Sequence, residues 1–350
     1  MDDLRTLIGK TIVVGVRGAD PDSPELIEEL AICAEAHAGG VILFDRDLAT
    51  RGDRNIRCPK QVKELSACLR ERLGDELLIM IDQEGGAVAR LGADRSFDPG
   101  VSAAEFALLD EAEQRRCAAA QASQLSALGI NVNLAPTVDL SIEGSSTVIA
   151  GLGRSFGPDP TEVLRCASVW IEEHQRAGVA VCLKHFPGHG SASGDTHESL
   201  VDITDRASAD AEIAPFQALC HERGVMVMTG HLLDQTVDPE LPASLSAAHT
   251  EGSLRHGLGF NGVVVTDSID MGAISARWSP GAAAALAIGA GADLVIDGVN
   301  ARGPVRTNPA LEIADAIARA IREGRIVNGE QRLLASAARV DRLLAEVRQG

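Results

Sequence analysis

The chain has 350 residues, of which 45% are hydrophobic and 23% charged, a balance typical of soluble globular proteins that excludes extensive disorder. Its formal net charge of −18 argues against a surface for the phosphate backbone, so we expect no nucleic-acid partner. The sequence has no run of 18 apolar residues, and its start, MDDLRTLIGK, lacks the pattern of a signal peptide. We therefore expect no membrane partner.

The seven cysteines are odd in number, scattered, and never spaced as C-x-x-C. This usage is typical of free thiols in a reducing compartment, and it predicts a cytoplasmic protein. We expect a monomer or a weak homo-oligomer.

Eight short apolar runs recur along the chain without alternating with polar residues, as expected for parallel strands buried on both faces. These runs are Thr11–Val16, Val41–Phe44, Leu77–Ile81, Ile130–Ala135, Ala180–Leu183, Val225–Thr229, Gly262–Thr266 and Asp293–Ile296. Amphipathic stretches of helical length lie between them, including Pro24–Ala38, Gln61–Leu73, Ala103–Leu128, Pro160–Ala177 and Ala209–Arg223. Glycines follow these stretches at 39, 74, 129, 178 and 224, where we expect helix C-caps.

Eight strand–helix repeats without a break in composition predict an α/β fold, a (β/α)8 TIM barrel that forms one domain over residues 1–350. Ala310–Glu323 would be the last barrel helix, and Glu330–Val347 an additional C-terminal helix. A doubly wound open sheet is the alternative, because the number of strands does not show closure.

Charged side chains follow several of the predicted strands, among them Asp82, Asp139, Lys184 and Asp267. Barrel enzymes carry their chemistry at the carboxyl ends of the strands, so these residues predict a site for a polar substrate.

The densest motif begins at Lys184 and His185 and continues into a glycine-rich loop that ends Asp195-Thr-His197. A carboxylate bonded to one imidazole nitrogen fixes the tautomer and raises the basicity of the other nitrogen, as a general acid/base requires. The glycines predict a mobile loop that closes over the site. A metal site is the alternative, although no H-x-H or H-E-x-x-H pair is present, and we expect no metal and no cofactor.

Two further motifs supply carboxylates. Asp267 ends a buried strand, a position suited to attack on the anomeric carbon of a sugar. Asp270 follows as a possible helix cap. Asp82 could accept hydrogen bonds from a pair of sugar hydroxyls, with Arg90 on the loop beyond.

Several of these motifs occur in a characteristic order: Asp82-Gln-Glu-Gly-Gly86 with Arg90-Leu91, Asn133-Leu-Ala-Pro136, Gly153-Arg-Ser-Phe-Gly157, Lys184-His-Phe-Pro-Gly-His-Gly190, Asp195-Thr-His197 and Thr266-Asp267. The chain thereby resembles glycoside hydrolase family 3, in its single-domain bacterial β-N-acetylglucosaminidase branch, over nearly its whole length. The departures are Ala87, where the family often has Arg, the Thr of Asp195-Thr-His197, and a longer, more charged turn at Phe44–Asp47 with the loop Leu48–Pro59 that follows it.

The resemblance implies a retaining β-N-acetylhexosaminidase that removes terminal N-acetylglucosamine from small saccharides, such as fragments recycled from peptidoglycan. It implies that Asp267 is the nucleophile and that His197, oriented by Asp195, is the acid/base. The residues that would hold the terminal sugar are Asp82, Arg90, Arg154, Lys184 and His185.

Other activities stay open at this point. A phosphorylase or a β-glucosidase of the same family would use much of the same machinery. Lys184 at a strand end could form the Schiff base of an aldolase. A non-catalytic sugar-binding barrel is the remaining alternative. Aromatic residues make up only 3% of the chain, with no tyrosine, which favours a short saccharide over a polysaccharide.

Overall fold

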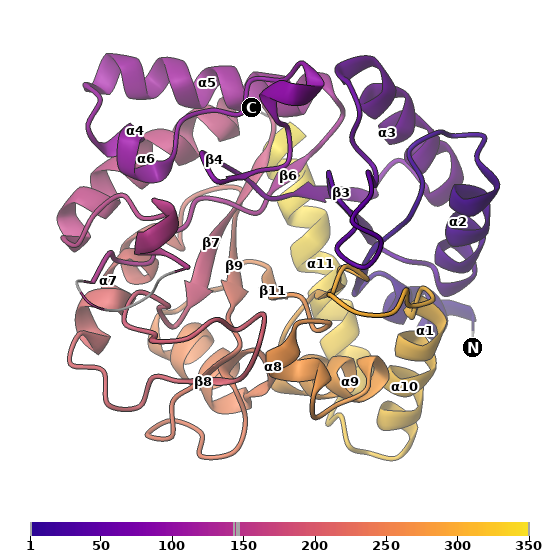
Figure 1. Ribbon diagram of the computed structural model, residues 1–350. Helices are drawn as coiled ribbons and strands as arrows, with labels where there is room; N and C mark the ends of the chain where they lie inside the picture. Colours follow the sequence, from indigo (N-terminus) through magenta and orange to yellow (C-terminus); the bar gives the residue numbers. More distant parts are fainter. Residues whose placement is uncertain (1, 143, 145–147, 349–350) are drawn as a thin grey trace.

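The barrel strands are short and buried along their whole length. The computed structural model describes residues 2–142, 144 and 148–348 (Figure 1). The strands that form its main sheet are β1 (Ile12–Gly15), β2 (Gly40–Leu43), β3 (Leu78–Ile81), β6 (Val132–Asn133), β7 (Ala180–Phe186), β9 (Val225–Thr229), β11 (Val264–Thr266) and β12 (Val295–Asp297). They pair in the order β11-β9-β7-β6-β3-β2-β1-β12, and every pairing is parallel.

The sheet closes on itself between its first and last strands. A parallel bridge joins Val265 to Leu294, and the amide of Ile269 donates to the carbonyl of Ile296 at 2.9 Å. This closure confirms the (β/α)8 barrel and excludes the open, doubly wound sheet.

The helices surround the barrel (Figure 1). They are α1 (Asp2–Gly9), α2 (Pro24–Ala36), α3 (Pro59–Leu73), α4 (Ala103–Ala107), α5 (Glu111–Ala127), α6 (Pro160–Arg176), α7 (Ala209–Leu219), α8 (Gly272–Ser275), α9 (Pro280–Ala290), α10 (Ala310–Arg322) and α11 (Gly329–Arg348). Short 3-10 turns cover Ala93–Arg95, Ala150–Leu152 and Ala243–Leu245, and a π-helix covers Ala248–Gly257. Two small sheets pair β4 (Gln83–Gly85) with β5 (Val88–Ala89) and β8 (Val201–Asp202) with β10 (Leu232–Leu233). No helix in the described part of the chain is both long and apolar enough to cross a bilayer.

The apolar core has two main parts. The larger lies between the sheet and the helices, and the second fills the barrel with side chains such as Leu78, Met80 and Val265. Leu343 and Leu344 of α11 belong to this inner cluster. The additional C-terminal helix that the sequence predicts is therefore present (Figure 1). Its apolar side chains join the inner cluster.

Three local predictions were wrong. Gly224 does not cap the helix before it, because α7 already ends at Leu219 and its C-cap is Cys220. The stretch Ala103–Leu128 is not one helix, because the side chain of Asp110 accepts from the amide of Glu113 and starts a new helix, α5. Gly39 is not the cap of α2; His37 takes the left-handed conformation instead, with φ 55°.

Candidate active site

A cavity of about 510 Å³ lies at the carboxyl ends of the barrel strands. Apolar side chains from four strands or their ends contribute to it, namely Ile42, Leu134, Met228 and Ile296. Five of the eight predicted site residues line its wall: Asp82, Arg90, Asp195, His197 and Asp267. Residues more than 180 positions apart in the sequence thus meet at one end of the barrel.

The backbone around Asp267 is fixed. Its amide donates to the carbonyl of Thr229 on β9 at 2.9 Å, and its carboxylate accepts from the amide of Ser268 at 2.7 Å. The buried His231 donates from Nε2 to the carbonyl of Ser268 at 2.8 Å, while its Nδ1 accepts from the hydroxyl of Ser244. This turn leaves the carboxylate facing the cavity.

The carboxyl of Asp267 has a low pKa. Burial alone would raise it, but His231, His185 and His197, together with the amide of Ser268, lower the pKa to about 2. The hydrogen bond from the Ser268 amide lowers the pKa of Asp267 whether the imidazoles are charged or neutral. Asp267 is therefore ionised at neutral pH, as a nucleophilic carboxylate must be.

His197 and Asp195 form a pair on the loop between β7 and β8. The imidazole donates from Nδ1 to the Asp195 carboxylate at 2.8 Å, and the amide of His197 donates to the same oxygen at 2.9 Å. These bonds from His197 outweigh burial and keep the pKa of Asp195 below its usual value. The pairing leaves Nε2 free of the carboxylate, the arrangement expected for proton transfer.

The loop that carries this pair lies over the cavity. The side chain of His197 is 63% exposed, yet it lines the same cavity as Asp267. The carbonyls of Thr196 and His197 accept hydrogen bonds from Ala273 and Gly272, at 3.2 and 3.0 Å. The end of the loop is therefore fixed to the segment that follows β11, at the wall of the cavity.

A chain of opposite charges continues from Asp82 into the protein. Lys184 Nζ lies 2.8 Å from Asp82 Oδ1 and 2.7 Å from Glu84 Oε1, and Arg154 makes two bonds of 2.8 Å to Glu84. Although burial opposes ionisation, these pairs hold the pKa of Glu84 low and those of Lys184 and Arg154 high. Arg154 and Lys184 are not among the residues that line the cavity. Lys184 is connected to the cavity wall by its ion pair with Asp82.

Sequence reasoning missed Glu84 as a member of this chain. The available signal was its spacing from Asp82, because residues two apart in an extended segment point to the same side.

Arg90 lies at the wall between two carboxylates. Its guanidinium nitrogens are 3.9 Å from Asp45 and from Asp82, and its Cζ lies 5.7 Å from the centre of the Phe44 ring. Arg90 is 31% exposed, so it can donate to a bound ligand.

His185 is held by Asp139, a fully buried carboxylate. Its Nδ1 donates to Asp139 at 2.7 Å, and the amides of His185 and His189 donate to the same carboxylate. Burial opposes ionisation of Asp139, but His185 outweighs it and lowers the pKa of the carboxyl. Asp139 therefore organises the turn that follows Lys184, a role that the sequence had not assigned to it.

A further part of the cavity rim was only partly expected. Arg46, in the charged segment 44–59, lines the cavity together with Asn300 and Arg302, which the sequence did not single out. Asn300 accepts from the amide of Leu48 and donates to the carbonyl of Arg46, and its own amide donates to Asp270 at 2.6 Å. Asp270 thus shapes this rim rather than capping α8, whose N-cap is Met271.

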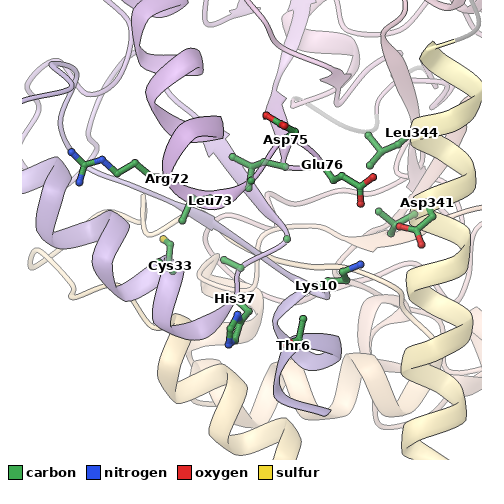
Figure 2. Close-up of a pocket in the computed structure, with 16 residues that line it drawn as sticks. Thr6, Lys10, Cys33, His37, Arg72, Leu73, Asp75, Glu76, Asp341 and Leu344 are labelled. Atoms are coloured by element: carbon green, nitrogen blue, oxygen red, sulfur yellow. The ribbon is translucent and has the colours of Figure 1, made fainter. Parts of the chain in front are cut away.

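A second hollow, of about 360 Å³, lies near the amino ends of β1, β2 and β3. Figure 2 shows side chains from α2, α3 and α11 around it, including Cys33, Arg72 and Asp341. None of the predicted site residues lines it. In the described part of the chain, no three His, Cys, Asp or Glu side chains are grouped as metal ligands.

A closed (β/α)8 barrel with an ionised carboxylate and a carboxylate-bound histidine at one strand-end cavity has the architecture of a barrel enzyme. Residues 13–343 match the model of the glycosyl hydrolase family 3 N terminal domain. The chain belongs to this family and is a glycoside hydrolase.

Similar proteins cover most of the chain. A β-hexosaminidase of Alkalilimnicola ehrlichii is 34% identical over 293 residues, which are 81% of this chain and 79% of that protein. The structure of a family 3 β-N-acetylglucosaminidase from Paenibacillus sp. FPU-7 matches with TM-score 0.86 and 34% identity, over 99% of this chain and 62% of that longer chain. A β-N-acetylhexosaminidase from Beutenbergia cavernae matches with TM-score 0.81 and 28% identity, over 98% of both chains.

Proposed function

We propose that the protein is a retaining β-N-acetylhexosaminidase that removes terminal β-linked N-acetylglucosamine from small saccharides. The observation that carries this proposal is that Asp267 and the His197–Asp195 pair line one cavity. The activities named for the relatives from Alkalilimnicola ehrlichii and Beutenbergia cavernae support it.

The mechanism has two steps. In the first, the carboxylate of Asp267 attacks the anomeric carbon, the bond to the leaving oxygen breaks, and protonated His197 gives that oxygen its proton. In the second, neutral His197 accepts a proton from water, the water oxygen bonds to the anomeric carbon, and Asp267 leaves. Asp195 orients the imidazole in both steps.

We assign the terminal sugar to the side of the cavity lined by Asp82 and Arg90. Asp82 accepts from Lys184 with one oxygen, which leaves acceptor capacity for a sugar hydroxyl. Lys184, His185 and Arg154 then act in binding mainly by holding Asp82, Glu84 and the turn at 185–189 in place.

The buried ion pairs of Lys184 disfavour the Schiff-base chemistry of an aldolase. A Schiff-base lysine must lose its proton to attack a carbonyl group. Burial would favour that loss, but Asp82 and Glu84 raise the pKa of Lys184 above its ordinary value. The amine is therefore kept as a cation, which suits an ion pair and not a nucleophile.

We also propose a cytoplasmic enzyme that acts on short fragments of the cell wall. All seven cysteines are free, as in a reducing compartment. The cavity of about 510 Å³ is of the size that binds a small ligand, and aromatic platforms for a long polysaccharide are scarce.

Hydrolysis of p-nitrophenyl β-N-acetylglucosaminide beside the matching β-glucoside tests the proposal. We expect the amino sugar to be the better substrate and free N-acetylglucosamine to be the product with or without phosphate. Preference for the glucoside would instead assign a β-glucosidase, and formation of the sugar 1-phosphate would assign a phosphorylase.

A further inference from the structure

The position of His197 depends on its backbone. Its side chain is 63% exposed, and both its Nδ1 and its amide donate to Asp195, two residues away on the same turn. The carbonyl of Asp195 in turn accepts from the amides of Glu198 and Ser199, at 3.0 and 3.2 Å. Residues 195–199 therefore form one compact turn, and whatever holds that turn also places the imidazole.

Two backbone hydrogen bonds attach this turn to the segment after β11. Gly272 donates to the carbonyl of His197 at 3.0 Å, and Ala273 donates to that of Thr196 at 3.2 Å. Thr196 is only 3% exposed, so this contact is largely shielded from water.

The same segment carries Asp267. The amide of Met271 donates to the carbonyl of Ser268 at 3.1 Å, and the amide of Ile269 donates to Ile296 on β12. A short, hydrogen-bonded segment of four residues, 268–271, thus connects Asp267 to Gly272. The two groups that must act on one glycosidic bond are positioned through this connection.

The contact requires glycine at position 272. A Cβ atom there would lie 2.5 Å from the carbonyl oxygen of Glu198 and 2.7 Å from that of His197, whereas real Cβ atoms essentially never come closer than 3.0 Å. Both obstructing atoms belong to the backbone of the turn, so no side chain can rotate away to make room. Gly272 is not among the glycines with positive φ, so alanine would suit its backbone conformation, and the atoms nearest to its Cβ would be those of the turn.

We propose that Gly272 is a positioning residue for the acid/base: its lack of a side chain lets the turn at 195–199 approach and keeps His197 over the cavity of Asp267. This proposal rests on the proposed role of His197. It predicts that Gly272→Ala displaces the turn and weakens proton transfer while leaving Asp267 in place.

The test compares kcat/KM, which reports the first chemical step, for two substrates. Chitobiose has a leaving group that needs protonation, and 2,4-dinitrophenyl β-N-acetylglucosaminide has one that does not. We expect Gly272→Ala to reduce kcat/KM for chitobiose by roughly 10- to 100-fold, a part of the usual contribution of general acid catalysis. For the dinitrophenyl substrate the value should stay within about threefold of wild type, which also shows that the variant is folded.

A double variant shows whether Gly272 acts through His197. If it does, Gly272→Ala combined with His197→Ala should be no slower on chitobiose than His197→Ala alone, because residues that act as a unit are not additive. Gly289→Ala is the matched control, since a Cβ there meets only Ile326, at 3.7 Å. It should behave as wild type.

Equal losses on both substrates, wild-type activity of Gly272→Ala, or additive losses in the double variant would each overturn the positioning role. These outcomes leave the proposed function standing if His197→Ala alone shows the leaving-group dependence. If His197→Ala shows no such dependence, the acid/base assignment fails, and the role of Gly272 fails with it.

Discussion

His197 and Asp267 differ in how strongly the protein holds them. The carboxylate of Asp267 follows a barrel strand and accepts a backbone hydrogen bond, whereas the imidazole of His197 is largely exposed and bonded to a neighbour on its own loop. This difference matches their proposed roles, since a nucleophile needs one fixed direction of attack and an acid/base must serve two successive steps.

Replacement of His197 should therefore affect substrates selectively. We expect His197→Ala to lower kcat/KM for chitobiose by roughly 10²–10⁴-fold, the usual scale of general acid catalysis. The kcat/KM for the dinitrophenyl glycoside should fall far less. Steady-state kinetics on both substrates measures this, with His256→Ala, an exposed histidine on the π-helix, as the control. A uniform loss on both substrates would argue against proton transfer by His197.

At the scale of residues, the sequence was sufficient to predict site residues that are charged and follow a strand or belong to a motif, such as Asp267, Asp195 and His197. It did not show the partners of Glu84 and Asp139. Their importance arises from partners 70 and 46 residues away, Arg154 and His185, which only the closed barrel brings within hydrogen-bonding distance. It placed Arg154 among the residues that hold the sugar, and the fold pairs Arg154 with Glu84.

At the scale of elements, Asp293 connects α11 to the barrel. This fully buried carboxylate, just before β12, accepts from Ser336 and Arg339 of α11 at 2.7 and 2.8 Å. Its other oxygen accepts from Arg255 of the π-helix and from the amide of Val264 on β11. One side chain thus joins three elements around the amino end of the barrel.

Removal of this charge should destabilise the protein. We expect Asp293→Asn to lower the free energy of unfolding by about 3–5 kcal/mol, because two arginines would lose a buried partner. Urea denaturation measures the change. Asp341→Asn, an exposed substitution on the same helix, should change stability by no more than about 0.5 kcal/mol. Similar stability of the two variants would show that Asp293 does not anchor α11.

The sequence predicted the strands and the long helices because their apolar runs and lengths are local properties. It did not predict the π-helix at Ala248–Gly257 or the break between α4 and α5. The break depends on Asp110 competing locally for the amide of Glu113. At the end of α2, His37 accepts the left-handed conformation because the chain must turn there, although glycine would adopt it at lower cost.

At the scale of the whole molecule, buried histidines make stability depend on pH. Burial lowers the pKa of His174 and His249 to about 4, and burial with the charge of His185 lowers that of His189 to about 4. In the unfolded chain the same groups take up protons near pH 6.5. Between these values the unfolded state binds more protons, so stability falls as the pH falls.

We expect the free energy of unfolding to decrease by several kcal/mol between pH 7 and pH 4.5, at about 1.4 kcal/mol per histidine and pH unit. Asp297 opposes this trend, because burial and Asp270 raise its pKa to about 6 and the folded state then binds the extra proton. The three histidines contribute more to the pH dependence of the free energy of unfolding than the one carboxyl does. Urea denaturation at several pH values checks the slope, and a stability that stays constant or rises on acidification would contradict it.

Covalent labelling of Asp267 tests the central claim most directly. A 5-fluoro N-acetylglucosaminyl donor with a good leaving group should trap the glycosyl-enzyme, and mass spectrometry of the digested protein should find the sugar on the peptide that contains Asp267. The Asp267→Asn variant should remain unlabelled under the same conditions. A label on another carboxylate, or rapid turnover of the donor without any covalent intermediate, would contradict the retaining mechanism proposed for this site.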